Sequence, residues 1–367
     1  AVLNEMAPDD AADIIGDLPY DKAEKLLRLM GVEESASVRS LLGYKEETAG
    51  GIMTTDFLTV NDDLTVADAI EAIRQMDEDQ ESIHYLYLVS DNGVLTGVLG
   101  LRTLVIAKPE TALDEISTKE LITVHPDLDQ EECAQTIAKY DLLAIPVVDE
   151  QGIILGVVTV DDAMDVMEDE ATEDMEKMAA MLPTDKPYLR TSAFDTFKSR
   201  IPWLLLLMVS ATLTGIVITR FENSLAALPC LTAFIPMLMG TGGNSGSQTS
   251  TTVIRSMALD EIELSDFFRV WWKEVRVALL CGTALAIVNY IRIVLQYHDW
   301  AVAMTVSLTL IVTVLVAKSL GCILPMLAKK LKLDPALMAS PMLTTITDAC
   351  SILVFFIFVM AILGGRL

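Results

Sequence analysis

Hydrophobic and polar positions divide the chain into two regions that require different solvents. From residue 200 to residue 367, long apolar stretches alternate with short polar connections. The first stretch, between Arg200 and Arg220, holds 19 uncharged residues, which is the length that an α-helix needs to cross a bilayer. Four similar stretches follow it, so the pattern predicts an all-α, polytopic membrane domain with five transmembrane helices over residues 200–367.

The second apolar stretch, between Glu222 and Arg255, is the least typical of the five. It contains 32 uncharged residues, and its part from Gly240 to Ser250 is rich in glycine, amide and hydroxyl groups. Such a segment cannot face lipid, so we expect it to depart from ordinary helix from Gly240 onward and to line a pore or cross another helix closely. A phosphate-binding loop is the rival interpretation, but the lysine of a P-loop and the strand before it are missing. The candidate pore-lining residues are Gly242, Gly243, Asn244, Gly246 and Gln248.

The region before residue 200 has the patterns of a soluble α/β protein. Residues 1–50 predict short helices with too few apolar positions for a core of their own. Residues 53–162 contain an internal repeat with a period of about 60 residues, and each copy predicts a strand, a helix and two further strands. The sequence Asp91-Asn92-Gly93 between two apolar runs is typical of a hairpin turn.

Charge separates the same two regions. Residues 1–200 carry 43 acidic and 15 basic side chains, whereas residues 201–367 carry 9 and 11. The net charge of −26 argues against nucleic acid as a partner, because no basic face is available to neutralise phosphates, and it favours cations. Basic residues gather on one side of the predicted spans. Because cytoplasmic loops retain Lys and Arg, we expect the N-terminus to be cytoplasmic and the C-terminus to lie outside.

The most acidic segment follows the repeat. Residues 163–182 predict a helix, and eight carboxylates fall within 14 positions that begin at Asp161, with Lys177 beyond them. Like charges three or four positions apart repel one another on a helix, so this helix requires cations that screen it. We favour a metal-sensing role over a plain solvated face.

A single carboxylate, Asp348, lies inside the fifth apolar stretch. An ionisable residue within a membrane helix marks an ion path or a proton relay by default. The alternative is a structural aspartate paired to Arg292 or Lys318. Hydroxyl groups at Thr344 and Thr345 suit a hydrated ion, and these two threonines complete the candidate pore metal site.

A second carboxylate, Asp334, precedes the same stretch. Asp334-Pro335 is expected to open the helix as its N-cap and first residue. Asp348 follows 14 positions later, which is about 3.9 turns, so both carboxylates would lie near one face unless Pro341 kinks the helix.

The internal repeat resembles a tandem CBS module, most specifically in the passage PVVDEQG at 146–152. CBS pairs usually dimerise and often bind adenosine nucleotides. The resemblance therefore implies a dimer and leaves open a bound nucleotide such as ATP, with Asp161 or Asp162 near its ribose. The alternative is a module that only braces the dimer.

The order of these segments, the motif GGNSGSQ at 242–248 and the sequence DPA at 334–336 together resemble the MgtE family of magnesium channels. The resemblance implies a homodimer in the lipid of the plasma membrane, with its pore at the subunit interface. It implies that Asp348 holds a hydrated Mg²⁺ ion and that Asp334 lies at the cytoplasmic mouth. It also assigns regulatory Mg²⁺ ligands to nine cytoplasmic positions: Asp9, Asp13, Asp129, Glu131, Asp141, Asp162, Glu170, Glu173 and Asp174.

The expected fold class is a multi-domain chain. A helical fragment covers residues 1–50, α/β tandem CBS domains cover 51–162, an acidic connecting helix and linker cover 163–199, and the membrane domain covers 200–367. The N-terminal domain of the family is longer than 50 residues, so we expect a partial domain here.

The function implied is a Mg²⁺-selective channel for magnesium uptake that is gated shut by Mg²⁺ on its acidic cytoplasmic domains. The alternative is a carrier of Mn²⁺, Co²⁺ or Ni²⁺ with CBS nucleotide-dependent regulation, although hard oxygen ligands near Asp348 disfavour softer metals. An enzyme is not expected, because the three histidines form no HExxH motif and no nucleophile–base pair is evident.

Overall fold

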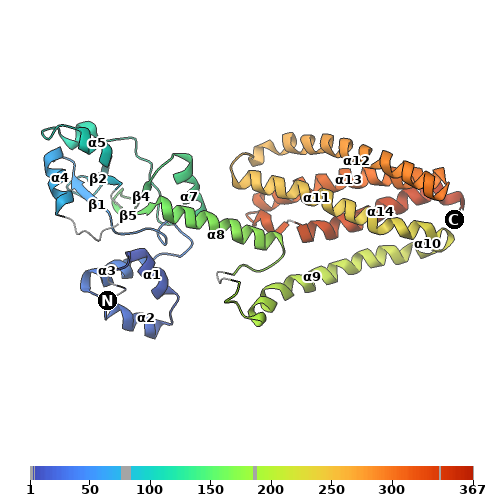
Figure 1. Cartoon of the computed structure of the whole chain (residues 1–367), viewed down its shortest axis with the longest axis horizontal. Coiled ribbons are helices and arrows are strands. Elements are labelled where there is room, and N and C mark those ends of the chain that lie inside the picture. The colour runs from blue at the N-terminus through green and yellow to red at the C-terminus, as the bar shows by residue number, and fades with distance from the viewer. Residues whose placement is uncertain (1–2, 4, 76–83, 185–187, 339, 367) are drawn as a thin grey trace. The chain divides into compact units, whose positions relative to one another are not determined.

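In the described chain every strand lies before residue 160 and the long helices follow (Figure 1). The computed structural model describes residue 3 and residues 5–75, 84–184, 188–338 and 340–366. The chain divides into a first unit over residues 1–170 and a second unit over residues 171–367. Helix α8 (Val160–Met178) begins in the first unit and ends in the second.

The predicted internal repeat is confirmed in the first unit. In the first copy, a parallel pair of β1 and β2 is followed by an antiparallel pair of β2 and β3. In the second copy β4 and β5 are antiparallel, and a parallel bridge from Val124 to Val147 stands where β1 stands in the first. The elements are β1 (Leu58–Asn61), α4 (Val66–Arg74), β2 (Tyr85–Val89) and β3 (Leu95–Gly100), then α7 (Gln130–Lys139), β4 (Ala144–Val148) and β5 (Ile154–Thr159). Two short helices, α5 (Leu101–Ile106) and α6 (Leu113–Ile116), lie between the copies.

Both hairpins of the repeat turn at a glycine in the left-handed region. Gly93 has φ of +78° and Gly152 has φ of +80°, a conformation that other residues adopt at a steric cost. Each hairpin also carries a register shift at the same place, after Leu88 in one copy and after Val147 in the other. The turn predicted at Asp91-Asn92-Gly93 is therefore confirmed, and the two copies share one geometry.

Helices α1 (Pro8–Gly16), α2 (Tyr20–Leu27) and α3 (Val32–Leu41) do not form a core of their own. Their buried side chains, among them Ile15 and Leu41, belong to one hydrophobic cluster with Val147 and Val158 of the second copy. Burial of apolar surface stabilises both partners of such a contact, so this shared cluster supplies the core that the short helices lack.

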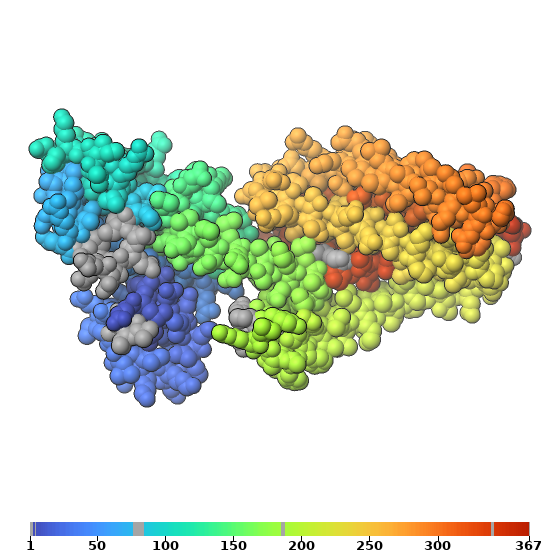
Figure 2. Space-filling view, viewed as in Figure 1, coloured from blue at the N-terminus to red at the C-terminus, as the bar shows by residue number. Residues whose placement is uncertain are grey.

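Four helices of the described chain are long and apolar enough to span a membrane. Among them α13 is the most buried and α9 the least. The helices of the second unit are α9 (Ala193–Arg220), α10 (Glu222–Ala227), α11 (Ile235–Ala258), α12 (Phe267–Tyr297), α13 (Trp300–Lys330) and α14 (Ser340–Leu363), with 3-10 turns η2 (Pro229–Phe234), η3 (Leu264–Asp266), η4 (Pro335–Met338) and η5 (Gly364–Arg366). In the space-filling view only part of α14 is visible between α9 and α11 (Figure 2).

The departure from helix that was expected at Gly240 is wrong. Helix α11 continues as α-helix through the whole segment 240–250. The physical reason is packing, because the backbone groups remain satisfied within the helix while small side chains let α13 and α14 approach it closely. The close helix crossing, which was the second expectation for this segment, is what the structure contains.

The expected opening of the fifth span also needs correction. Pro335 begins the 3-10 turn η4, and α14 begins at Ser340. The side chain of Asp334 caps the 3-10 turn, because its Oδ1 accepts a hydrogen bond of 2.7 Å from the amide of Ala336. The spacing argument that relied on one continuous α-helix from Asp334 to Asp348 therefore does not hold.

Candidate functional site

Asp348 lies on α14 and is half-buried. Within the described part of the chain its carboxylate makes no hydrogen bond and no ion pair. The structural alternative is contradicted, because Arg292 bonds to Asn289 while Lys318 bonds to Thr249 and pairs with Glu274. The carboxylate of Asp348 is thus uncommitted to any described protein group and is able to hold a cation.

The hydroxyl groups around Asp348 are oriented by the backbone of their own helix. Thr344 and Thr345 both donate to the carbonyl of Pro341, at 2.9 and 3.0 Å. Ser351 donates to the carbonyl of Thr347 at 2.6 Å. Each hydroxyl proton is therefore occupied, and the oxygen lone pairs remain as acceptors for the water shell of an ion.

The predicted pore-lining residues of α11 fall on two faces. Gly242, Gly243 and Gly246 are buried, whereas Asn244 and Gln248 are exposed in the single chain. A Cβ atom at Gly243 would lie 3.0 Å from the Thr344 side chain. A Cβ atom at Gly242 would lie 2.7 Å from Ser351 Oγ. The glycines therefore bring α11 against the part of α14 that carries Asp348, and the two amide side chains point elsewhere.

Asp334 forms the most direct link between the acidic helix and the segment before α14. Its Oδ2 lies 2.7 Å from Lys177 Nζ, and Lys177 Nζ also lies 2.5 Å from Glu173 Oε1. We call Glu173, Asp174, Lys177 and Asp334 the mouth cluster. The sequence pattern placed Lys177 beyond the acidic residues and did not predict its contact with Asp334. The contact with Glu173 could have been predicted, because opposite charges four positions apart pair on a helix.

Electrostatics within the mouth cluster are strongly coupled. Burial alone would lower the pKa of Lys177, but its hydrogen bonds to Asp334 and Glu173 raise that pKa above its ordinary value. Burial raises the pKa of Asp174, the carboxylate of Asp334 raises it further, and the ammonium of Lys177 lowers it. The charge of Arg255 also lowers the pKa of Asp174, so three carboxylates face Lys177 and Arg255, which leaves one excess negative charge for a further cation.

A second group of carboxylates lies in the first unit. Asp9 is only 8% exposed, and its Oδ1 has no hydrogen-bond partner among the described residues. Burial raises the pKa of Asp9. Burial and the charge of Asp9 also raise the pKa values of Asp13 and Asp162 to about 6. We call Asp9, Asp13 and Asp162 the Asp9 group, and its unpartnered buried oxygen fits a cation with hard oxygen ligands.

The other predicted regulatory residues have local roles in the structure. Asp129 caps α7 by accepting a hydrogen bond of 2.9 Å from the amide of Glu131. Glu170 accepts a hydrogen bond of 2.7 Å from Gln130. Asp141 follows α7 with φ of +53°. Asp129 also lines a polar cavity of about 390 Å³ together with Lys45, Glu46, Glu47, Thr48 and Asp127.

No three Asp, Glu, His or Cys side chains in residues 5–75, 84–184, 188–338 and 340–366 lie close enough together to form a metal site by themselves. Mg²⁺ usually keeps several of its waters and takes only one or two carboxylates from a protein. The mouth cluster, the Asp9 group and Asp348 are compatible with that mode of binding.

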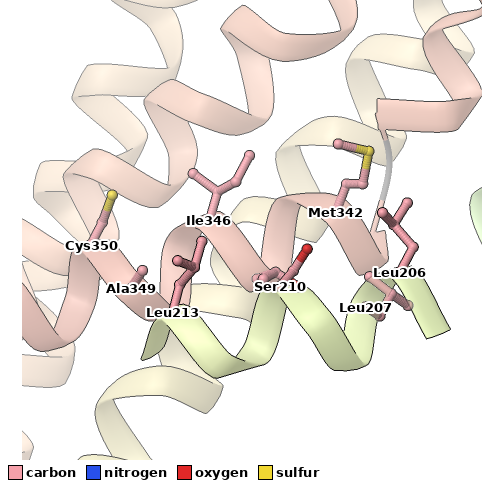
Figure 3. Close-up of a pocket in the computed structure, with 9 residues that line it drawn as sticks. Leu206, Leu207, Ser210, Leu213, Met342, Ile346, Ala349 and Cys350 are labelled. Atoms are coloured by element: carbon pink, nitrogen blue, oxygen red, sulfur yellow. The ribbon is translucent and has the colours of Figure 1, made fainter. Parts of the chain in front are cut away.

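An apolar cavity of about 310 Å³ lies between α9 and α14 (Figure 3). Thr345 and Ala349 border it, and these residues flank Asp348 in the sequence. Its other lining residues are Leu206, Leu207, Ser210, Leu213, Met342, Ile346 and Cys350. Because most of these side chains are apolar, the cavity does not suit a hydrated cation.

Comparison with family models matches most of the chain. A model described as a divalent cation transporter matches residues 235–358. A CBS domain model matches residues 49–110 and 113–169, and a model of the MgtE intracellular N domain matches residues 1–47.

Curated relatives agree with these matches, and two solved structures are similar to part of the chain. The magnesium transporter MgtE of Thermus thermophilus is 36% identical over 350 residues, which cover 95% of this chain and 78% of the relative. The magnesium transporter MgtE of Bacillus subtilis is 34% identical over 354 residues, covering 96% and 78%. A crystal structure of the soluble part of a magnesium transporter is 41% identical over 46% of this chain and 66% of that chain, with a TM-score of 0.45. A structure of the cytosolic domain of the Mg²⁺ channel MgtE in complex with ATP is 39% identical over 45% and 68%, with a TM-score of 0.43.

Proposed function

Because the chain belongs to the MgtE family of magnesium transporters, we propose that it is a Mg²⁺-selective channel for magnesium uptake across the plasma membrane. The observation that carries this proposal is Asp348. It is a half-buried carboxylate on an apolar helix, and no described protein group pairs with it. A charge in that position is costly unless an ion uses it.

The proposed conducting unit is a homodimer in which two Asp348 side chains face one path. Mg²⁺ sheds its waters reluctantly, so a path that offers two carboxylates to a hydrated ion would pass it more readily than a closed cage. The oriented hydroxyl groups of Thr344 and Thr345 would accept hydrogen bonds from the water shell.

The proposed membrane domain has five spanning helices, with a cytoplasmic N-terminus and an external C-terminus. Four of the helices have the length and hydropathy of spans. The 24-residue α11 is supported as the fifth because it packs against α13 and α14, although its glycine, hydroxyl and amide side chains make it less apolar. The orientation rests on the bias of Lys and Arg toward one side.

Regulation in this proposal comes from Mg²⁺ bound at the mouth cluster and at the Asp9 group. Each ion offsets repulsion between carboxylates and so stabilises the arrangement in which they are close. The closed state is favoured to the extent that it binds these ions more tightly than the open state. When cytosolic Mg²⁺ falls, the carboxylates separate and the channel opens.

A nucleotide such as ATP is proposed as a further ligand of the CBS module. Support comes from the tandem CBS match over residues 49–110 and 113–169. Isothermal titration of ATP into the purified full chain tests this, and no heat above dilution at millimolar ATP would exclude it.

The second candidate function is a carrier of Mn²⁺, Co²⁺ or Ni²⁺. The hydroxyl and carboxylate oxygens around Asp348 favour Mg²⁺ over Co²⁺ and Ni²⁺, whereas they suit Mn²⁺ as well. Replacing Mg²⁺ by each of these ions in the transport assay separates the candidates.

Inside-out patch recording tests the proposal directly. With Mg²⁺ as the only divalent cation, the wild-type chain should carry currents that close as bath Mg²⁺ rises from micromolar to millimolar. Asp348→Asn keeps the side-chain volume but removes the charge, and it should abolish the current. Asp260→Asn is a matched control, because Asp260 is exposed and its φ of +53° is one that Asn tolerates. No Mg²⁺ current in the wild type, or full current in Asp348→Asn, would overturn the proposal.

A further inference from the structure

A buried charge pair lies in the second unit, apart from the groups described above. Lys318 of α13 is 5% exposed, and its Nζ lies 3.7 Å from Glu274 Oε2 of α12. The Thr249 hydroxyl of α11 lies between them. It accepts a hydrogen bond of 3.1 Å from Lys318 Nζ and donates one of 2.7 Å to Glu274 Oε2. The ion pair of Lys318 and Glu274, together with the Thr249 hydroxyl, therefore joins α11, α12 and α13.

The pair lies beside a close approach of two helix backbones. A Cβ atom at Gly321 would lie only 2.4 Å from the carbonyl oxygen of Gly246, so α13 and α11 touch there through their main chains. Lys318 is one turn before Gly321, and Thr249 is one turn after Gly246. The side-chain contact thus fixes the same crossing that the two glycines form.

That crossing continues directly to the helix that carries Asp348. A Cβ atom at Gly246 would lie 3.1 Å from the carbonyl oxygen of Ala317 on α13 and 3.1 Å from Leu343 Cδ2 on α14. Gly246 is therefore held between the two helices. Any shift of α11 at Thr249 would be transmitted to α14 within about one turn of Asp348.

The two charges must compensate each other. An isolated charge in a membrane helix is costly, and breaking one partner of a buried pair leaves the other uncompensated. A lone ammonium among these helices would repel a divalent cation, and a lone carboxylate would attract it. With both present, the pair adds no net charge to the packed helices α11, α12 and α13.

We propose that Lys318 and Glu274 form a positioning pair that sets how strongly the Asp348 region holds a divalent cation. Thr249 couples this pair to the glycine face of α11. The inference rests on the proposed function, because it concerns the affinity of the cation path. It adds two residues and an electrostatic role that the family resemblance did not supply.

A charge cycle tests the pair. Glu274→Gln leaves the lysine uncompensated and should raise the Mg²⁺ concentration for half-maximal flux by at least about five-fold. Lys318→Met leaves the carboxylate and should lower this concentration by a similar factor. The double variant should return to within about two-fold of wild type, because a buried ion pair can be replaced by neutral groups of similar size. Lys330→Met removes the same charge from an exposed position of the same helix and should change the value by less than two-fold.

The readout separates positioning from folding. A merely structural role changes the number of folded channels and hence the maximal flux, but not the half-saturating concentration. If both single variants shift that concentration in the same direction, or the double variant does not restore it, the inference is overturned. If a single variant fails to reach the membrane, the charge swap Lys318→Glu with Glu274→Lys decides the matter by restoring or not restoring the wild-type value. Absence of Mg²⁺ flux in the wild type would instead defeat the proposed function.

Discussion

Lys177 Nζ lies 2.7 Å from Asp334 Oδ2, so an ammonium group of the acidic helix pairs with a carboxylate at the start of the segment that leads to α14. The same ammonium pairs with Glu173 at 2.5 Å. A lysine in this position has the charge sign of the regulatory ion and uses the same oxygen atoms. Under the proposed regulation, it would therefore compete with Mg²⁺ for the mouth cluster.

Lys177→Met tests this competition. The substitution leaves Glu173, Asp174 and Asp334 without the ammonium, so Mg²⁺ should bind among them more tightly. We expect half-maximal closure at about five-fold lower cytosolic Mg²⁺, together with a higher open probability when Mg²⁺ is removed, as measured in inside-out patches. Lys108→Met, at an exposed lysine of the first unit, serves as the control and should leave both values unchanged. A shift of closure to higher Mg²⁺ would contradict the competition.

Asp162 predicts a pH dependence of stability. Its pKa is raised from 3.8 to about 6, first by burial and then by the charges of Asp9 and Asp161. The folded state thus binds the proton more tightly than the unfolded state. The contribution is favourable at low pH and is lost as pH rises from about 4 through about 6. Without Mg²⁺, the melting temperature of the purified chain should fall over this interval.

Asp162→Asn is the matched variant for this pH effect. The amide oxygen still accepts a hydrogen bond from the Thr159 hydroxyl, and the substitution removes the charge that Asp9 opposes. We expect a higher melting temperature at pH 7 without Mg²⁺, a weaker dependence between pH 4 and 6, and a smaller gain on adding Mg²⁺. A variant that melts below wild type at pH 7, with an unchanged response to Mg²⁺, would show that Asp162 does not carry this linkage.

Sequence patterns predicted the elements whose causes are local. The hairpin turns depend on the φ values of their own glycines, and the apolar spans depend on their own length and hydropathy. Asp348 was identified because a lone carboxylate in an apolar stretch is conspicuous without any partner.

Contacts between distant segments could not be predicted from local sequence patterns. The ion pair of Lys177 with Asp334 joins residues far apart in the chain, and no periodicity indicates it. The segment 240–250 was expected to leave the helix because its composition alone disfavours one. Close packing on α13 and α14 outweighs that preference, and the packing partners cannot be read from the segment itself.

Neutralising three acidic residues together tests the regulatory role of the cytoplasmic carboxylates. Asp162→Asn, Glu170→Gln and Glu173→Gln remove charge from the Asp9 group, from α8 and from the mouth cluster. The variant has less repulsion between carboxylates for Mg²⁺ to offset. The cytosolic Mg²⁺ concentration that half-inhibits the current should therefore rise by at least about five-fold. Glu33→Gln with Glu34→Gln, in the first turn of α3, controls for the loss of surface charge. Inhibition equal to wild type in the triple variant would count against gating by these sites.

The glycines of the helix crossing give a prediction that depends on space alone. Gly321→Ala puts a methyl group 2.4 Å from a backbone oxygen of α11. The backbones of α11 and α13 must then move apart, which their close packing resists. Overpacking of this kind costs about 1–3 kcal/mol, so the variant should melt several degrees lower and carry less Mg²⁺ flux. Gly240→Ala is the control within α11, because nothing lies within 4 Å of the added methyl group. There the higher helix propensity of alanine should make the change neutral or stabilising by up to about 1 kcal/mol. Equal melting temperatures for the two variants would mean that the main-chain contact between Gly246 and Gly321 does not hold α11 against α13.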